Sequence, residues 1–192
     1  MKKTRKQLKA AKLEAFEGLV SEYEKPLLRY AGRILRDPNA AQDVVQETFV
    51  RLFRRWTDPM EPSGKLSSWL YRVAHNCAVD YVRKESRRRL LHLRQGEGAE
   101  AFAMPDRGKG FRISEGAEKA TVVLASLSLR EQQLVILKIY EEKSYKEISE
   151  ITGLTVSNVG YILHYAMKKM AAMLRTGEGH DTPTSKNPDK QE

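Results

Sequence analysis

The chain has 192 residues, 41% of them hydrophobic, so it is long enough for one domain or two small ones with a modest core. Its net charge of +9 is common in proteins that bind nucleic acid. The single cysteine excludes a disulfide framework, and no apolar run is long enough for membrane insertion, so a cytoplasmic protein is expected.

The first half of the chain is expected to form three helices. A basic segment (residues 1–15) precedes apolar residues spaced by three and four from Phe16 to Leu35, which indicates a long amphipathic helix. Asp37 followed by Pro38 is typical of a helix start, which opens a second helix. Its buried stripe should comprise Ala41, Val44, Val45, Thr48, Phe49, Leu52, Phe53 and Trp56.

Proline and glycine make residues 57–65 a predicted loop, and a third helix is expected from Ser67 to the arginines at 87–89. Trp69 is interpreted as a structural residue of this helix. Its exposed residues should include Tyr71, Arg72, His75 and Asn76. The arginine run is either a solvated helix end or a track for phosphates.

The polar face of the second helix carries two carboxylates, Asp43 and Glu47, one turn apart. Because they would repel phosphate, this face should not touch DNA. It is either an ordinary solvated face or a protein-docking face.

Residues 90–119 contain five glycines and one proline without a sustained period, which predicts a mostly extended linker. Structure should resume at residues 120–127, and Ser128 with Glu131 forms a capping box for a helix that reaches Tyr140. The polar residues 176–192 are predicted to be a disordered tail.

A helix-turn-helix is predicted over residues 144–170. Ser144 and Glu147 form a second capping box, and Gly153 supplies the turn between the two helices. The second helix, from about Ser157, should turn its exposed side towards a major groove, through Ser157, Asn158, Gly160, Tyr161 and His164.

The order of these segments resembles a bacterial sigma factor of the extracytoplasmic-function type, in the sigma-70 family. The resemblance rests on AQDVVQETFVRLF, then SSWLYRVAHNCAVDYVRKESRRR, and after the linker LSLREQQLVILKIYEEKSYKEISEITGLTVSNVG. It implies an all-α fold with two small helical domains and a flexible linker. Sigma region 2 would occupy residues 16–89, and sigma region 4 residues 120–175.

The resemblance also implies partners for these surfaces. Region 2 of the family docks on the beta-prime clamp helices of core RNA polymerase, and the matching residues are Asp43, Gln46 and Glu47. The polymerase beta flap and an anti-sigma factor are further implied partners. Region 2 also melts promoter DNA and captures minus-10 bases, and the matching positions are Met60, Lys65, Tyr71, Arg72, Val73, Asn76, Arg87, Arg88 and Arg89.

Region 4 of the family reads the minus-35 element as duplex DNA. The residues expected to contact it are Ser157, Asn158, Gly160, Tyr161, His164, Lys168 and Lys169. Many family members carry arginines at the positions of Gly160, Ile162 and Tyr165, and this chain has none of them. Fewer charge-assisted contacts to phosphate and guanine are therefore expected.

Neither catalysis nor a bound metal or cofactor is expected, because the four histidines are scattered and no Cys/His pair has ligand spacing. Two alternatives stay open: a regulator that binds operator DNA as a dimer through residues 144–170, and an interaction module whose basic surfaces bind an acidic partner. Melting that depends on core polymerase would separate the sigma factor from both.

Overall fold

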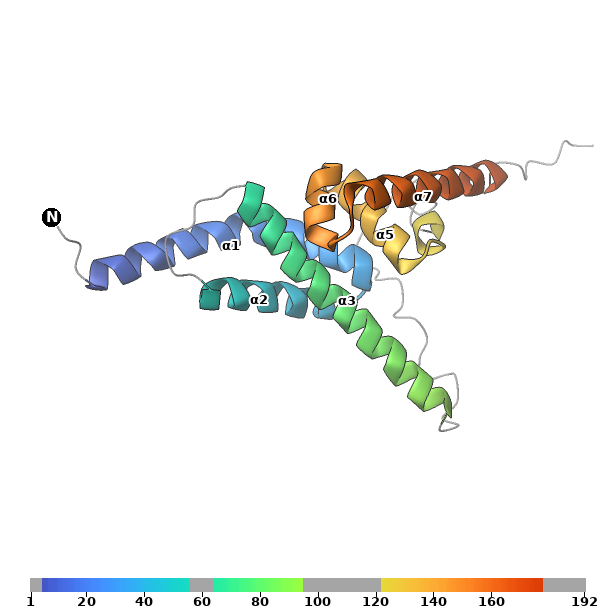
Figure 1. The fold of residues 1–192 in the computed structure, drawn as a ribbon. Coiled ribbons are helices and arrows are strands. Elements are labelled where there is room, and N and C mark those ends of the chain that lie inside the picture. The colour runs from blue at the N-terminus through green and yellow to red at the C-terminus, as the bar shows by residue number, and fades with distance from the viewer. Residues whose placement is uncertain (1–4, 56–63, 95–121, 178–192) are drawn as a thin grey trace, which may run out of the picture.

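The computed structural model describes residues 5–55, 64–94 and 122–177, and these residues form helices and connecting turns without strands (Figure 1). The N-terminal bundle consists of α1 (Arg5–Leu35), α2 (Pro38–Arg55) and α3 (Gly64–Arg94). The C-terminal bundle consists of α5 (Leu129–Val135), the π-helical segment η2 (Ile136–Tyr140), α6 (Tyr145–Thr152) and α7 (Val156–Gly177). The predicted all-α fold is confirmed.

Helix starts follow the predicted capping chemistry. Asp37 Oδ1 accepts hydrogen bonds from the backbone N–H groups of Asn39 (2.9 Å) and Ala40 (3.2 Å), which would otherwise lack partners in the first turn of α2. At α6, Ser144 Oγ accepts from the Glu147 backbone N–H at 3.3 Å, and Glu147 Oε2 accepts from the Ser144 backbone N–H at 2.8 Å.

The turn of the helix-turn-helix also forms as predicted. Gly153 has φ 74°, a left-handed conformation that costs a residue with a Cβ about 1–2 kcal/mol. Ser149 donates to the Leu154 carbonyl at 2.6 Å across the turn, and Ile148, Val159 and Leu163 are buried between the two helices. These contacts fix the angle at which α7 leaves α6.

Two helices are longer than predicted. α1 begins at Arg5, because lysine, leucine and alanine are good helix formers and let the helix extend beyond its packed part. α3 continues to Arg94, five residues past the predicted end. α3 also begins earlier than predicted: Gly64 and Lys65, expected to end a loop at residues 57–65, are the first residues of this helix. Residues 57–63 of that predicted loop, which include Met60, lie outside the described residues, as do Trp56, most of the predicted linker and all but the start of the tail.

The buried apolar residues form one continuous cluster that runs through both bundles. Leu27, Leu52 and Leu70 fill it between α1, α2 and α3. Among its described residues, the predicted stripe of α2 is buried apart from Phe53, which is 49% exposed. Phe53 contacts the Phe16 ring at 5.2 Å between centroids and has Lys12 Nζ 5.4 Å from its ring centre, both near the surface, so predicting it as buried was wrong.

The two bundles meet at the junction segment, Tyr140–Lys143, which joins η2 to α6. The Glu141 side chain is only 3% exposed. Tyr71 of α3 donates its hydroxyl to Glu141 Oε2 at 2.6 Å, and Arg33 of α1 lies 3.6 Å from Oε1 and 4.3 Å from the centre of the Tyr140 ring. A carboxylate of the C-terminal bundle is thus held by two helices of the N-terminal one.

Lys143, which precedes α6, adds a second set of contacts between the two bundles. Lys143 Nζ donates to Ser67 Oγ at 3.3 Å and lies 4.3 Å from the centre of the Tyr71 ring. Both partners belong to α3, beside which α6 packs. Tyr71 therefore contacts residues on both sides of Glu142, whose φ of 52° turns the chain sharply between them.

Candidate nucleic-acid and polymerase interfaces

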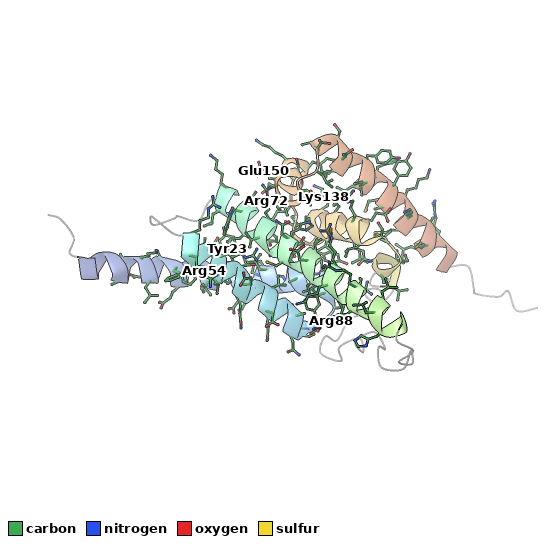
Figure 2. The ribbon with its side chains drawn as sticks, turned by 60° about the horizontal axis from the view of Figure 1, so that its bottom comes forward. Tyr23, Arg54, Arg72, Arg88, Lys138 and Glu150 are labelled. Carbon is green, nitrogen blue, oxygen red and sulfur yellow. The ribbon has the colours of Figure 1, made fainter. Side chains whose placement is uncertain are left out.

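A groove opens between the last turns of α2 and the first half of α3, with a volume of about 670 Å³. We call it the arginine groove, and it is lined by Arg51, Arg54, Arg55, Trp69, Arg72, Val73 and Asn76. Figure 2 shows Arg54 and Arg72 on neighbouring helices in this part of the molecule. Four guanidinium groups around an indole, a valine and an amide can hold phosphates while a base lies against the wall.

Sequence reasoning found three of these residues and missed four. Arg72, Val73 and Asn76 were expected in a minus-10 pocket, and they line the groove. Arg54 and Arg55 were overlooked, although basic residues in the last turn of α2, just before a predicted loop, were the available signal. Trp69, interpreted from the sequence as structural, is half-buried with a face on the groove.

Arg51 is constrained by its neighbour on α2. Its Nε donates to Glu47 Oε1 at 2.7 Å, and this hydrogen bond raises the pKa of Arg51 above its usual range. The pair is exposed and separated by one helical turn, so it adds little stability. It does direct the Arg51 guanidinium along the helix surface between the groove and the acidic face.

Two residues expected to be exposed on α3 are buried instead. Tyr71 is 3% exposed and His75 is 6% exposed, because α1 and the junction segment cover that side of α3. The Tyr30 hydroxyl and His75 Nδ1 lie 2.8 Å apart, and burial lowers the pKa of His75 to about 4, so the imidazole is neutral at pH 7. Burial and the bond to Glu141 raise the pKa of Tyr71, which keeps its hydroxyl a donor.

The remaining minus-10 candidates of α3 lie at its two ends. Lys65 is exposed in the first turn, and Arg87 and Arg88 are exposed towards the other end, whereas Arg89 is half-buried. Arg88 is 3.9 Å from Glu85 and lies well away from Arg54 and Arg72 (Figure 2). Of the predicted basic residues of α3, Arg72 therefore lines the groove, whereas Arg87 and Arg88 lie farther along the helix.

The acidic face of α2 is accessible. Asp43 and Gln46 are exposed and the Glu47 side chain is 43% exposed, on the side opposite Val44, Val45 and the rest of the buried stripe. Val50, on the next turn of the helix, is also exposed. The face thus combines two carboxylates with an amide and one apolar side chain, a composition that suits a basic protein surface better than DNA.

The exposed face of α7 carries most of the predicted minus-35 residues. Ser157, Asn158, Tyr161, His164 and Lys168 are all exposed. Gly160 is half-buried, and the Tyr145 ring lies 3.5 Å from where a Cβ would stand, so this position offers DNA no side chain and is covered by a neighbour.

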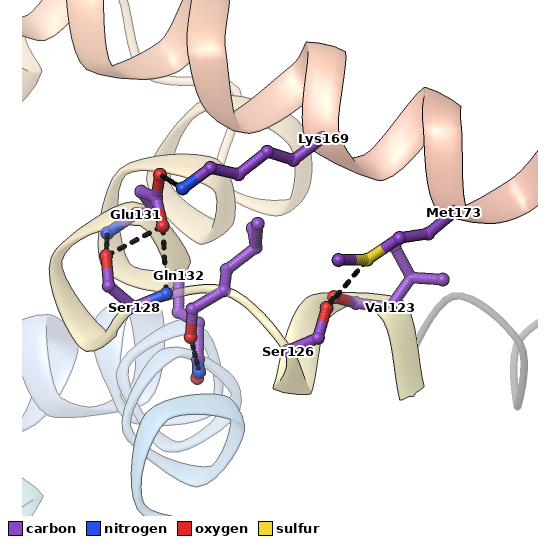
Figure 3. Close-up of polar contacts among 8 residues, drawn as sticks. Val123, Ser126, Ser128, Glu131, Gln132, Lys169 and Met173 are labelled. Atoms are coloured by element: carbon purple, nitrogen blue, oxygen red, sulfur yellow. Dashed lines mark hydrogen bonds and ion pairs between the residues drawn. The ribbon is translucent and has the colours of Figure 1, made fainter.

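Lys169 differs from the other predicted contacts of α7 because its ammonium is already engaged. Its Nζ lies 2.5 Å from Glu131 Oε1 (Figure 3). Glu131 completes the capping box of α5, and its other oxygen accepts from the backbone N–H of the N-cap residue Ser128 at 2.9 Å. The ion pair lowers the pKa of Glu131 and ties α7 to α5, so Lys169 has a structural partner within the C-terminal bundle.

Within the part of the chain that the structure describes, no group of three or more histidine, cysteine or acidic side chains is arranged to hold a metal ion. No helix among the described residues is both long enough and apolar enough to cross a membrane.

Comparison with known proteins identifies the two bundles. Residues 19–88 match sigma-70 region 2, and residues 117–170 match sigma-70 region 4, so the matches together cover more than half of the chain. The described residues of these two ranges lie in the N-terminal bundle with its groove and in the C-terminal bundle with its exposed α7.

Curated relatives match over nearly the whole chain. The extracytoplasmic-function sigma factor SigW of Bacillus subtilis is 28% identical over 187 residues, which cover 91% of this chain and 97% of SigW. SigL of Mycobacterium tuberculosis is 27% identical over 171 residues, covering 86% and 92% of the respective chains. The chain belongs to the sigma-70 family, as a sigma factor of the extracytoplasmic-function type. Its function is promoter-specific transcription initiation.

Two solved structures share the fold. One is the sigma factor RpoE in complex with the anti-sigma factor NepR from Bartonella quintana, with a TM-score of 0.65, 17% identity, and coverage of 83% of this chain and 96% of RpoE. The other is CnrH in complex with the cytosolic domain of CnrY, with a TM-score of 0.61, 22% identity, and coverage of 88% and 94%.

Proposed function

We propose that this sigma factor binds core RNA polymerase through the acidic face of α2 and captures separated minus-10 bases in the arginine groove. The observation that carries the proposal is the separation of the two surfaces: carboxylates and an amide lie on one side of α2, and Arg54 and Arg55 line a groove with α3. Polymerase contact and DNA contact therefore use different sides of one rigid helix.

The groove supplies what strand capture requires. Unstacking a base costs a few kcal/mol, and stacking on an aromatic ring with cationic contacts to the phosphates offsets that cost. Trp69 offers the ring, Arg54 and Arg72 offer the charges, and Asn76 offers hydrogen bonds to a base edge. Arg87 and Arg88 extend the track along α3, whereas Tyr71 is left out because its hydroxyl is bound to Glu141.

In the same proposal the exposed side of α7 reads the minus-35 element in duplex DNA. Asn158, Tyr161 and His164 face outward in the first turns of a helix whose angle is fixed by Gly153. The two readers then bind one promoter, and binding of one raises the effective concentration of the other. The chain itself carries out no catalytic step, and its place of action is the cytoplasm, with polymerase.

We also propose the beta-prime clamp helices and the beta flap as the polymerase contacts, and an anti-sigma factor as a further partner. Family membership supports the polymerase contacts. The likeness of the fold to RpoE, which was crystallised with the anti-sigma factor NepR, supports the anti-sigma partner.

The test is open-complex formation on a promoter that carries a fluorescent adenine analogue in the minus-10 region, with and without core polymerase. The wild-type protein should melt the DNA only with core. An Arg54→Ala, Arg72→Ala variant should still bind core, but its salt slope for single-stranded DNA should fall by about 1.4, because each phosphate that is no longer neutralised accounts for ~0.7.

An Asp43→Ala, Glu47→Ala variant should instead lose affinity for core polymerase. Glu150→Ala, which removes an exposed carboxylate from α6, is the matched control and should change neither step. Tight duplex binding without core and without melting would contradict the proposal and favour a dimeric regulator that binds operator DNA.

A further inference from the structure

The reading face of α7, defined here as Ser157, Asn158, Tyr161, His164 and Tyr165, carries no lysine or arginine. The whole stretch from Val156 to Met167 contains neither lysine nor arginine. This stretch makes up the first three turns of the helix, the part that meets base edges when such a helix enters a major groove.

Aromatic rings dominate this face. Tyr161 is 63% exposed and Tyr165 is 46% exposed, and their ring centres lie 4.6 Å apart. His164 contacts the Tyr165 ring edge-on at 5.5 Å. Because the rings support one another, they present a firm apolar surface at little entropic cost on binding.

The chemistry of this face selects among base pairs. Guanine is read most often by two donors of one arginine or lysine, whereas adenine is read by the paired donor and acceptor of asparagine or glutamine. Thymine offers a methyl group that favours apolar contact. Asn158 therefore suits adenine, and the Tyr161 ring suits a thymine methyl, while the face has no side chain suited to bidentate guanine contact.

Two lysines described beside the reading face have partners within the protein, and one of them, Lys138, has its Nζ 5.4 Å from the centre of the Tyr145 ring. The Tyr145 ring closes the position of Gly160, and Lys169 is paired with Glu131. Lys168 is exposed two turns beyond Tyr161, on the same side of the helix. That place suits a phosphate contact at the edge of the groove rather than a base contact.

We propose that α7 recognises A·T base pairs in the minus-35 element, with Asn158 reading an adenine and Tyr161 a thymine methyl, and that guanine contributes little to recognition. This inference rests on the proposed function, because it assumes that α7 enters the major groove of promoter DNA. It adds the class of base pair that is read and the two residues that determine specificity.

The test uses the full chain bound to core polymerase and a promoter library with a randomised minus-35 segment. Sequences retained at equilibrium should be enriched in A·T pairs at the contacted positions. In one selected promoter, replacing the contacted adenine by 7-deazaadenine removes N7, and replacing the contacted thymine by uracil removes the methyl group. Each replacement should weaken binding. A full bidentate contact corresponds to about 5- to 150-fold, and 7-deazaadenine should cost less than this because it keeps the N6 donor, as should the loss of the methyl group.

Variants link each base to its residue. Asn158→Ala should abolish the effect of 7-deazaadenine and keep the effect of uracil, and Tyr161→Ala should do the reverse. Lys168→Ala is the control: it should weaken binding to all sequences alike and reduce the salt slope by about 1. All three side chains are exposed, so the variants should fold.

Other outcomes separate the two proposals. Enrichment of G·C pairs, or an Asn158→Ala variant that stays sensitive to 7-deazaadenine, would overturn the A·T reading while leaving minus-10 capture intact. Melting that is indifferent to the minus-35 segment would also overturn it. A wild-type protein that melts no promoter with core would instead refute the proposed function.

Discussion

Removing the Tyr71 hydroxyl should destabilise the free chain by breaking the contact between the bundles. In Tyr71→Phe, Glu141 keeps only Arg33 at 3.6 Å, and its Oε1 already has no hydrogen-bond partner. A hydrogen bond to a buried charged group contributes ~1.5–3 kcal/mol. We therefore expect a loss of about 2 kcal/mol in the free energy of unfolding, which lowers Tm by about 4–8 °C for a chain of this size.

The assay is urea unfolding at pH 7, followed by circular dichroism, of the wild type, Tyr71→Phe, Glu141→Ala and the double variant. A coupling energy of at least about 1 kcal/mol between the two sites is expected, because the residues are in direct contact. Tyr81→Phe, in an exposed ring, is the control and should stay within about 0.5 kcal/mol of the wild type. A coupling energy near zero would refute the reasoning, since it would mean that the bundles are apart in the free chain.

Three further effects are expected. His75 has a pKa of about 4 in the folded chain against ~6.5 unfolded, so its stabilisation is present above pH 6.5 and is lost as pH falls towards 4. When the pH falls from 7 to 5, the free energy of unfolding of the wild type should thus decrease by about 2 kcal/mol more than that of His75→Gln, measured by urea unfolding at both pH values. Equal decreases would contradict a lowered pKa of His75. Gly153→Ala should lower the free energy of unfolding by about 1–2 kcal/mol, through backbone strain at a positive φ, because the added Cβ itself meets open space. Gly153→Asn should lower it less, since asparagine tolerates the left-handed region; equal Tm values for the two variants would contradict strain as the cause. Ser144→Ala should lower the free energy of unfolding by about 1 kcal/mol and weaken minus-35 binding, and Glu147→Ala should have a smaller effect in the same assays. An unchanged Tm of Ser144→Ala would show that the cap of α6 adds no stability.

Features that depend on neighbouring residues could be predicted from the sequence. Asp37 and Ser144 cap helices through hydrogen bonds to residues two or three positions away, and Gly153 turns the chain by its own φ. Family resemblance extended this to both bundles, because the order of the segments was visible in the sequence.

Features that depend on distant residues could not be predicted from the sequence. The burial of Tyr71 depends on Glu141, 70 positions away, and the burial of His75 depends on Tyr30, 45 positions away. Both side chains are polar enough to resemble an exposed face in the helical pattern of α3. In the arginine groove, Arg54 and Trp69 become neighbours only because α2 and α3 pack together across residues that separate them in sequence.

The junction segment also sets an order of events during synthesis. Tyr71 leaves the ribosome 70 residues before Glu141, which at ~5–20 residues per second is an interval of about 4–14 seconds. A helical bundle folds far faster than that, so the N-terminal bundle is complete while its docking surface still faces water. Docking of the two bundles is therefore the last step of folding. A partner that binds the nascent chain before this step finds the docking surface of the N-terminal bundle exposed.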